Sequence, residues 1–343
     1  MREKQMAMTT KDISFVTISL YGTGTATIDW GDRTVKTLTL SSDYSDYKEY
    51  QHSYSDTVLH TITISGRNIT HLQCPRELTS IDVSWNTALI ELSCGGGQLT
   101  SIDVNRHTKL TLLGCCRNKL TSLDLSKNTK LTLLDCHDNQ LASLDLSKNT
   151  KLTLLDCNDN QLEGLDVSRN TALEQLRCAN NQLISLDISK NTMLRRLWCF
   201  SNQLKSLDLS KNIALNDLCC DGNQLTSLNV SDNTELIRLN CSCNQLSDLD
   251  VSKNIVLKEL LCDGNQLTSL NVSNNTAIKR LDCSNNQLSV TALNSLFKTL
   301  HDYDLKMEKI IFIGNNPGTD YCDTSIATDK GWIVKSSLSD VTF

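Results

Sequence analysis

Cys116, His137 and Asn158 lie 21 residues apart from one another, and together they are the residue types of a thiol-hydrolase site. In such a site the imidazole lowers the pKa of the thiol, and the amide orients the imidazole. Asp135 and Asp156 stand two residues before His137 and Asn158. Zn²⁺ bound by Cys116, His137 and a carboxylate is therefore the second chemistry that this spacing permits.

Both chemistries need a site that excludes water. If the three residues lie on successive strands, they are on the exposed face of a sheet. Such a face offers neither a pocket nor an oxyanion hole. The sequence also has no Gly-rich phosphate loop, HExxH or GxSxG motif. We therefore expect no enzyme, no cofactor and no bound metal, and keep a thiol-dependent hydrolase or metal site at Cys116, His137 and Asn158 as the alternative.

A repeat of 21 residues organises the elements that carry these side chains. Each copy joins a segment LxxLxCxxN to a second segment in which the cysteine is replaced by an aliphatic residue. Alternating inward and outward residues in each segment are typical of a short strand, so we expect parallel strands on both broad sides of a stacked solenoid. From Cys94 onward the repeat cysteines are 21 residues apart, and they are Cys74, Cys94, Cys115, Cys136, Cys157, Cys178, Cys199, Cys220, Cys241, Cys262 and Cys283.

Two rows of asparagine share the same period. One runs from Asn118 to Asn286, the other from Asn86 to Asn275. An Asn side chain both donates and accepts, so it can satisfy the backbone groups that a tight turn leaves unpaired. We interpret both rows as structural, and the cysteines as small buried core residues whose thiols are inert.

The pattern LxxLxCxxNQLxSLDLSxNT resembles the bacterial leucine-rich repeats with nested ten- and eleven-residue units, of the Bacteroides type, over residues 69–288. The resemblance implies a mostly β protein with a solenoid of about eleven 21-residue coils at residues 67–288. It says little about function, because repeat folds have many ligands.

The two ends depart from the repeat. Residues 1–11 are expected to be disordered, and the alternating runs of residues 12–66 predict a small β-sandwich that also caps the solenoid. Its segment ATIDWGD, with His52 and Tyr54 downstream, resembles PKD-like domains. Residues 289–343 predict a C-terminal α/β cap, with an amphipathic helix from Val290, a strand in KIIFIG, a short helix and a final strand.

The outward positions differ between the two sides. One side repeats Ser-Asp-Ser in nearly every coil. Its Asp row could bridge Ca²⁺, but Asn229 and Asn271 substitute in it, which favours a hydrogen-bonding role. The cysteine side changes in every coil, and we call its outward positions the variable face. Exposed aromatic residues with arginine are typical of interfaces, so the predicted partner-binding residues are Trp198, Phe200, Arg177, Arg195, Arg196 and Arg238.

Composition narrows the class of partner that this protein could bind. With 33 Lys+Arg against 39 Asp+Glu the net charge is -6, which argues against nucleic acid. No apolar run approaches the roughly 20 residues of a membrane span, and no apolar segment of an export signal follows the first charges. We therefore expect a non-enzymatic module that binds a protein, with a glycan as the alternative. The family resemblance implies a cell-surface or extracellular location.

Overall fold

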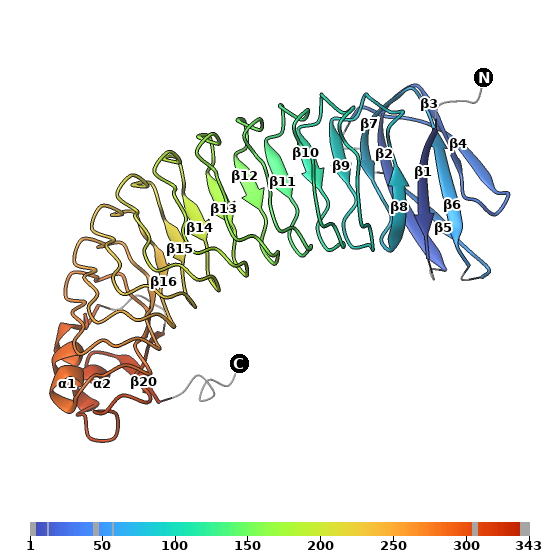
Figure 1. Cartoon of the computed structure of the whole chain (residues 1–343). Helices are drawn as coiled ribbons and strands as arrows, with labels where there is room; N and C mark the ends of the chain where they lie inside the picture. The colour runs from blue at the N-terminus through green and yellow to red at the C-terminus, as the bar shows by residue number, and fades with distance from the viewer. Residues whose placement is uncertain (1–4, 12–13, 44–47, 57, 304–307, 337–343) are drawn as a thin grey trace. The chain divides into compact units, whose positions relative to one another are not determined.

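The computed structural model describes residues 5–11, 14–43, 48–56, 58–303 and 308–336 (Figure 1). It divides into two compact units, residues 1–173 and 174–343. The described part is almost entirely β-strands and turns, with two helices near the C-terminal end.

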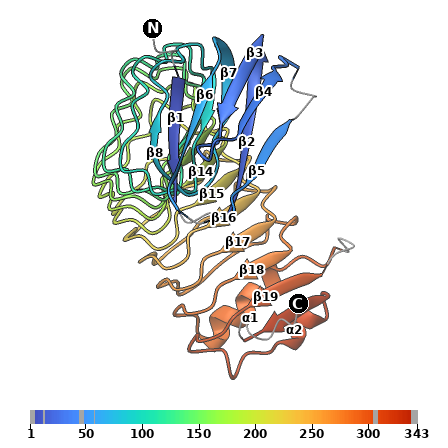
Figure 2. The same cartoon turned by 90° about the vertical axis from the view of Figure 1, so that its right-hand side faces the viewer.

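Two antiparallel groups of strands begin the first unit (Figure 2). One sheet has the order β4-β3-β6-β1-β8, and the other begins β5-β2-β7. Their buried residues include Met6, Ile28 and Ile64 from the first sheet and Ile18 from the second, which makes a small β-sandwich. The strands are β1 (Gln5–Thr10), β2 (Phe15–Thr23), β3 (Thr25–Asp29), β4 (Val35–Thr39), β5 (Glu49–Ser53), β6 (His60–Ser65), β7 (Asn68–Gln73) and β8 (Leu78–Asp82).

The expectation of disorder for residues 1–11 is wrong for residues 5–10, which form β1. Met6 and Met8 are each 1% exposed, and β1 is hydrogen-bonded to β6 on one side and to β8 on the other. The segment is short and carries only two large apolar residues, so its strand depends on partners that are distant in the sequence. Residues 1–4 lie outside the described part of the chain.

The motif residues of the sandwich meet in space. His52 Nε2 lies 2.7 Å from Asp32 Oδ2, and the His52 ring stacks on Trp30 with centroids 4.9 Å apart. The Tyr54 hydroxyl donates to the Trp30 carbonyl at 2.7 Å. Hydrogen bonds from Thr34 and the nearby His52 hold the pKa of the Asp32 carboxyl well below its usual range.

The sandwich continues directly into the first coil of the solenoid. β7 pairs with β2 on one edge and with the first repeat strand on the other, while β8, on the opposite side of the same coil, pairs with β1. β2 and β1 therefore occupy strand edges that the first coil would otherwise expose.

Short parallel strands on the cysteine side stack with a shift of 21 residues between partners, for example Leu113 beside Leu134. In the first unit they are β9 (Glu91–Ser93), β10 (Leu112–Gly114), β11 (Leu133–Asp135) and β12 (Leu154–Asp156). In the second unit they are β13 (Gln175–Arg177), β14 (Arg196–Trp198), β15 (Asp217–Cys219), β16 (Arg238–Asn240), β17 (Glu259–Leu261) and β18 (Arg280–Asp282).

The repeat cysteines point inward, as predicted. From Cys115 to Cys283 each is 0% exposed, among leucines that are equally buried. Burial raises the pKa of the Cys136 and Cys220 thiols well above the ordinary value, so these thiols stay protonated. The ladder is therefore a hydrophobic element of the core.

The prediction of strands on both broad sides is wrong, because the Ser-Asp-Ser side forms no strand beyond β8. There side chains accept backbone N–H bonds: Asp124 Oδ1 accepts from Ser126 N at 2.9 Å, and Asn139 Oδ1 accepts from Leu120 N at 3.0 Å. Asn229 accepts the equivalent bond from Ser231 N at 3.0 Å, which explains why Asn can replace Asp.

Both Asn rows satisfy buried backbone groups. Asn118 Nδ2 donates to the carbonyl oxygens of Cys94 at 2.9 Å and Cys115 at 3.1 Å. In the second row Asn149 Nδ2 donates to Leu125 O at 3.1 Å, and His107 takes the place of Asn with its Nε2 3.0 Å from Val83 O. Each coil thus depends on side chains that reach into the preceding coil.

The residue before each Asn of the first row has a left-handed backbone. Its φ lies between 51° and 64°, and the residues are Arg117, Asp138, Asp159, Asn180, Ser201, Gly222, Cys243, Gly264 and Asn285. Left-handed φ favours Asn, Asp and Gly, which occupy most of these positions. The turn therefore favours these residue types without requiring them, since Arg117, Ser201 and Cys243 also occupy it.

The predicted C-terminal α/β cap is confirmed. Its elements are α1 (Val290–Thr299), β19 (Lys309–Phe312), α2 (Ser325–Thr328) and β20 (Trp332–Lys335), and β19 and β20 extend the parallel sheet beyond β18 (Figure 2). Ser289 caps α1 by accepting from Ala292 N at 3.2 Å. At its other end Lys330 Nζ donates to the carbonyl oxygens of Lys298 and Leu300, each at 2.7 Å.

Candidate functional site

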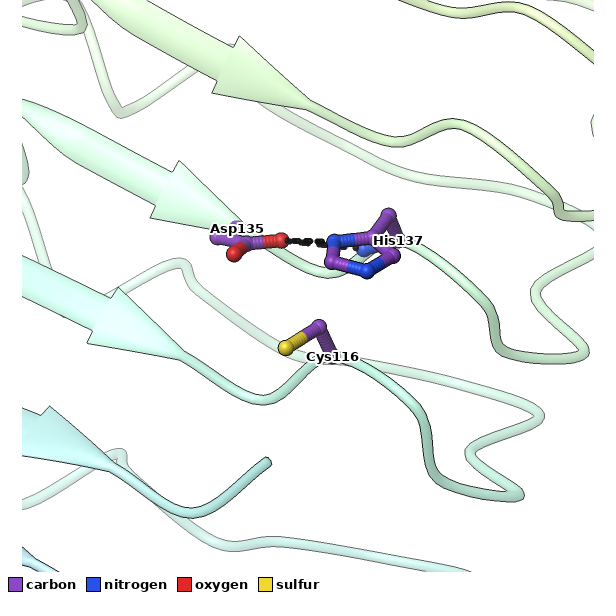
Figure 3. Close-up of side chains that lie close together, drawn as sticks. All are labelled: Cys116, Asp135 and His137. Carbon is purple, nitrogen blue, oxygen red and sulfur yellow. Dashed lines mark hydrogen bonds and ion pairs between the residues drawn. The ribbon is translucent and has the colours of Figure 1, made fainter. Parts of the chain in front are cut away.

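The variable face of the first unit brings together Cys116, Asp135 and His137. Their potential ligand atoms lie within 4.8 Å of one another, and all three side chains are half-buried. Asp135 ends β11, His137 follows it two residues later, and Cys116 occupies the position equivalent to His137 one coil earlier (Figure 3). His137 Nδ1 lies 2.6 Å from Asp135 Oδ1.

This geometry differs from the thiol-hydrolase arrangement considered above. The group that orients His137 is Asp135, whereas Asn158 donates its backbone N–H to Asp156 Oδ1 at 3.3 Å. Burial, with the negative charge of Asp135, raises the pKa of the Cys116 thiol to about 11. A thiol nucleophile needs the opposite shift, so these electrostatics disfavour thiol-dependent hydrolysis.

The side that repeats Ser-Asp-Ser, which we call the constant side, offers a different surface. A shallow depression of about 540 Å³ there is lined by Ser143, Asp145, Gly164, Asp166 and Arg169. Asp145 and Asp166 each accept the backbone N–H of a serine two residues later, at 2.9 Å. These hydrogen bonds lower the pKa of both carboxyls, which is the structural role expected for the Asp row.

In the second unit, the variable face is centred on Trp198. The Arg177 guanidinium carbon lies 4.7 Å from the centre of the Trp198 ring, and that of Arg196 lies 5.9 Å from it. Arg177 comes from β13, directly beside Trp198 in the strand register. The structure thus brings together three of the six predicted partner-binding residues as two arginines around one indole.

Arg196 also belongs to a row of charged side chains that crosses successive strands. Arg196 Nε lies 3.3 Å from Asp217 Oδ2 and its Nη1 donates to Gln175 Oε1 at 3.1 Å. Farther along the row, Glu259 pairs with Arg238 at 3.0 Å and with Arg280 at 3.5 Å. Arg238 is therefore part of a separate ion-pair group.

The other two predicted residues flank the cluster. Arg195 is exposed and Phe200 is half-buried. Trp198 and Phe200 are both half-buried rather than fully exposed. Arg177 and Arg196 cover part of the Trp198 ring.

One feature of the variable face was missed by reasoning from the cysteine neighbours alone. Leu112, Leu133 and Leu154 occupy the same outward strand position in three adjacent coils and are half-buried. The signal is in the sequence, where the doubled leucine of LTLLGC and LTLLDC places the first leucine outward and the second inward. Together they form an apolar row on a polar solenoid surface.

Comparison with solved structures places this architecture among leucine-rich repeat proteins. The functional domain of InlJ from Listeria monocytogenes, which includes a cysteine ladder, is 34% identical with a TM-score of 0.64, covering 76% of this chain and 61% of that one. The internalin InlF of the same organism is 26% identical with a TM-score of 0.64, covering 72% of this chain and 74% of that one.

A chain in the octameric complex of Latrophilin 3, Unc5D and the leucine-rich repeat part of FLRT2 is 21% identical, with a TM-score of 0.57. The match covers 76% of this chain and 87% of that one. No protein-family model and no curated protein matches the sequence.

The fold is therefore a leucine-rich repeat solenoid, and its structural neighbours include bacterial leucine-rich repeat proteins. The chain spans less than two thirds of the InlJ structure that it resembles, 61% of its length. Within the described residues, no helix has the length and apolar character needed to cross a bilayer.

Proposed function

We propose that this protein is a non-enzymatic interaction module that binds a protein partner through the variable face, with the cluster of Arg177, Arg196 and Trp198 at the centre of the contact. The observation that carries the proposal is the stacking of Arg177 on Trp198, with 4.7 Å between guanidinium carbon and ring centre. Arginine and tryptophan are enriched among the residues that dominate binding energy at interfaces.

The cluster is pre-organised to accept a partner. Adjacent strands hold Arg177 and Trp198 side by side, and Gln175 and Asp217 hold Arg196, so little side-chain entropy is lost on binding. The Trp198 Nε1 group is buried and has no hydrogen-bond partner among the described residues. A carboxylate group of a partner would pair with the arginines.

The same geometry favours a protein over a glycan. A sugar ring stacks on an open aromatic face, but Arg177 already occupies the neighbourhood of the Trp198 ring. The solved neighbour FLRT2 occurs in a complex with Latrophilin 3 and Unc5D. For the present chain that comparison supports a protein partner without identifying it.

The flanking regions fit a supporting role. We infer that residues 12–66 together with β1 are a PKD-like sandwich that caps the solenoid of residues 67–288, and that residues 289–343 cap its other end. The pairing of β1 with β8 and of β19 with β18 supports both assignments. A cell-surface or extracellular location, as the resemblance implies, would present the variable face to partners outside the cell.

Capture of partners from cell-surface fractions tests the proposal. Trp198→Ala combined with Phe200→Ala should leave the fold intact and reduce the captured partner at least about tenfold, because a central aromatic residue contributes about 2 kcal/mol or more to binding. Ser143→Ala with Ser185→Ala, on the constant side, is the matched control and should capture as much as the wild type. A folded double aromatic variant that captures its partner normally would show that the interface lies elsewhere.

A further inference from the structure

We propose that Cys116, Asp135 and His137 form a binding site for a single divalent transition-metal ion, with Zn²⁺ the best fit. The three residues offer one sulfur, one nitrogen and carboxylate oxygens within 4.8 Å of one another. The proposal concerns the first unit of the chain and does not depend on the partner contact proposed around Trp198.

The chemistry of the donor set selects the class of metal. A thiolate and an imidazole are ligands that Zn²⁺ and neighbouring transition metals prefer, whereas Ca²⁺ and Mg²⁺ prefer sites built from oxygen atoms alone. Three protein ligands of mixed type, with a fourth position left open, are the usual number at non-structural zinc sites. The site is thus distinct from the Asp row on the constant side, which offers only oxygen.

The backbone holds the ligands at the same level of the solenoid. β10 and β11 are parallel and paired in register, and Arg117 N donates to His137 O at 2.8 Å immediately after the strands. Zinc bonds of about 2.0–2.3 Å place tetrahedral ligand atoms roughly 3.5 Å apart. The present 4.8 Å limit therefore requires side-chain shifts of only about 1 Å, with no change in the backbone.

Asp135 orients the histidine for metal binding. Its Oδ1 lies 2.6 Å from His137 Nδ1, so Nδ1 carries the proton in the absence of metal, and these two facing atoms are the oxygen and nitrogen ligands of one ion. Cys116 lies beside the Asp135–His137 pair, so its Sγ is the third ligand atom (Figure 3). On binding, the Cys116 thiol releases its proton to solvent, the imidazole proton of His137 moves from Nδ1 to Nε2, and sulfur–metal and nitrogen–metal bonds form.

Two glycines lie next to the cluster, and Cys116 packs against one of them. Gly114 occupies the position equivalent to Asp135 one coil earlier, and a Cβ there would have no neighbour closer than 3.5 Å. Gly95 occupies the position equivalent to Cys116, and a Cβ there would lie 2.7 Å from Cys116 Sγ. The side chains of His137 and Asp135 are 25% and 31% exposed, so a hydrated ion can reach them directly.

Other thiols of the variable face lack this combination. Cys219 lies near Asp217, with 3.9 Å between Sγ and Oδ1, and Cys243 is exposed. Neither belongs to a group of three mutually close ligand residues among the described part of the chain, in which Cys116, Asp135 and His137 are the group found. This difference makes Cys219 and Cys243 suitable internal controls.

Titration with Co²⁺ alone, followed by Zn²⁺ competition, tests the site in the full chain. Co²⁺ bound to a thiolate gives a charge-transfer absorption, and we expect it to saturate at one ion per chain and to be displaced by Zn²⁺. Cys116→Ser should abolish the absorption, and His137→Ala should weaken binding at least about tenfold. Cys219→Ser combined with Cys243→Ser is the matched control and should bind as the wild type does.

Thermal unfolding with Zn²⁺ alone provides a second readout that is independent of absorption. A metal that binds only the folded chain raises Tm, so Zn²⁺ should raise Tm for the wild type and the control but not for His137→Ala or Cys116→Ser. Far-ultraviolet circular dichroism without metal confirms that each variant is folded. Absence of saturable Co²⁺ binding to the wild type, or equal binding by folded His137→Ala, would overturn the proposal.

Discussion

Arg177 and Trp198 are neighbours in space only because β13 and β14 pair in register, 21 residues apart in the sequence. The Arg177 guanidinium carbon lies 4.7 Å from the centre of the Trp198 ring, within the range of a cation–π contact. The arginine covers an aromatic surface that water would otherwise reach, and it keeps its charge at the surface. This pair links the stability of the solenoid surface to its proposed binding role.

The energy of that pair should appear in a double-mutant cycle. Arg177→Ala, Trp198→Ala and the double variant are expected to give a coupling energy of about 0.5–2 kcal/mol, because the cation–π contact is partly desolvated. Denaturant unfolding of the four proteins measures it. Arg195→Ala, which changes an exposed neighbouring arginine, should show no coupling to Trp198→Ala.

The inward cysteines should be costly to make polar. Cys220 is 0% exposed, so Cys220→Ser places a hydroxyl in the core without room for water and should lower the free energy of unfolding by about 1–3 kcal/mol. Cys243→Ser, at an exposed position of the same unit, should change it by less than about 0.5 kcal/mol. Equal denaturation midpoints for the two variants would contradict the core role of the ladder.

Substitutions in the first Asn row should lower the free energy of unfolding more than substitutions in the cysteine ladder. Asn202 Nδ2 donates to Cys178 O at 3.0 Å and Cys199 O at 3.1 Å, and its Oδ1 accepts from Leu183 N at 3.0 Å. Asn202→Ala leaves these buried groups unpaired and should cost at least about 2 kcal/mol of unfolding free energy.

The exposed Asn274 is the control for that substitution. Its side chain makes one hydrogen bond, to Ser252 O at 3.1 Å, so Asn274→Ala should have an effect below about 1 kcal/mol. Thermal or denaturant unfolding of both variants checks the comparison. A tolerated Asn202→Ala would mean that water replaces the amide in the turn.

The Asp row predicts a dependence of stability on pH. Hydrogen bonds from Ser210 lower the pKa of the Asp208 carboxyl, and equivalent serine bonds lower those of Asp145 and Asp166. A carboxyl with a lowered folded-state pKa contributes stability above its unfolded pKa of about 4 and loses that contribution as pH falls through the folded value.

Replacing Asp145, Asp166 and Asp208 by Asn should therefore reduce the loss of stability at acid pH. Asn229 and Asn271 already accept the same serine N–H bond without a charge, at 3.0 Å and 2.9 Å. The variant Asp145→Asn, Asp166→Asn, Asp208→Asn should lose less Tm than the wild type between about pH 7 and about pH 3. An equal loss of Tm would assign the acid sensitivity to other carboxyls, such as Asp32 in the sandwich.

Much of the architecture could be predicted from the sequence because the same residue types recur at equivalent positions in every coil. The inward leucines and cysteines, the Asn turns and the α/β cap depend on residue types at fixed spacing, and a local pattern carries that information. The different chemistry of the two sides was visible for the same reason, since a position that recurs every 21 residues can be compared with its own copies.

Tertiary structure decided the features that depend on hydrogen-bond competition and on distant pairing. Beyond β8, the described coils form strands on the cysteine side only, and on the other side Asp and Asn side chains accept backbone N–H bonds. The short segment of β1 becomes a strand because β6 and β8 both pair with it.

The composition of each candidate site was decided in the same way. Sequence spacing proposed Asn158 as the partner of His137, but side-chain geometry selects Asp135, two residues away on the same strand end. Likewise, the pattern grouped five residues with Trp198, and of the arginines among them strand register and side-chain length bring Arg177 and Arg196 to its ring. Periodicity identifies the face on which a residue lies, whereas the neighbour that it contacts depends on side-chain rotamers and competing partners in three dimensions.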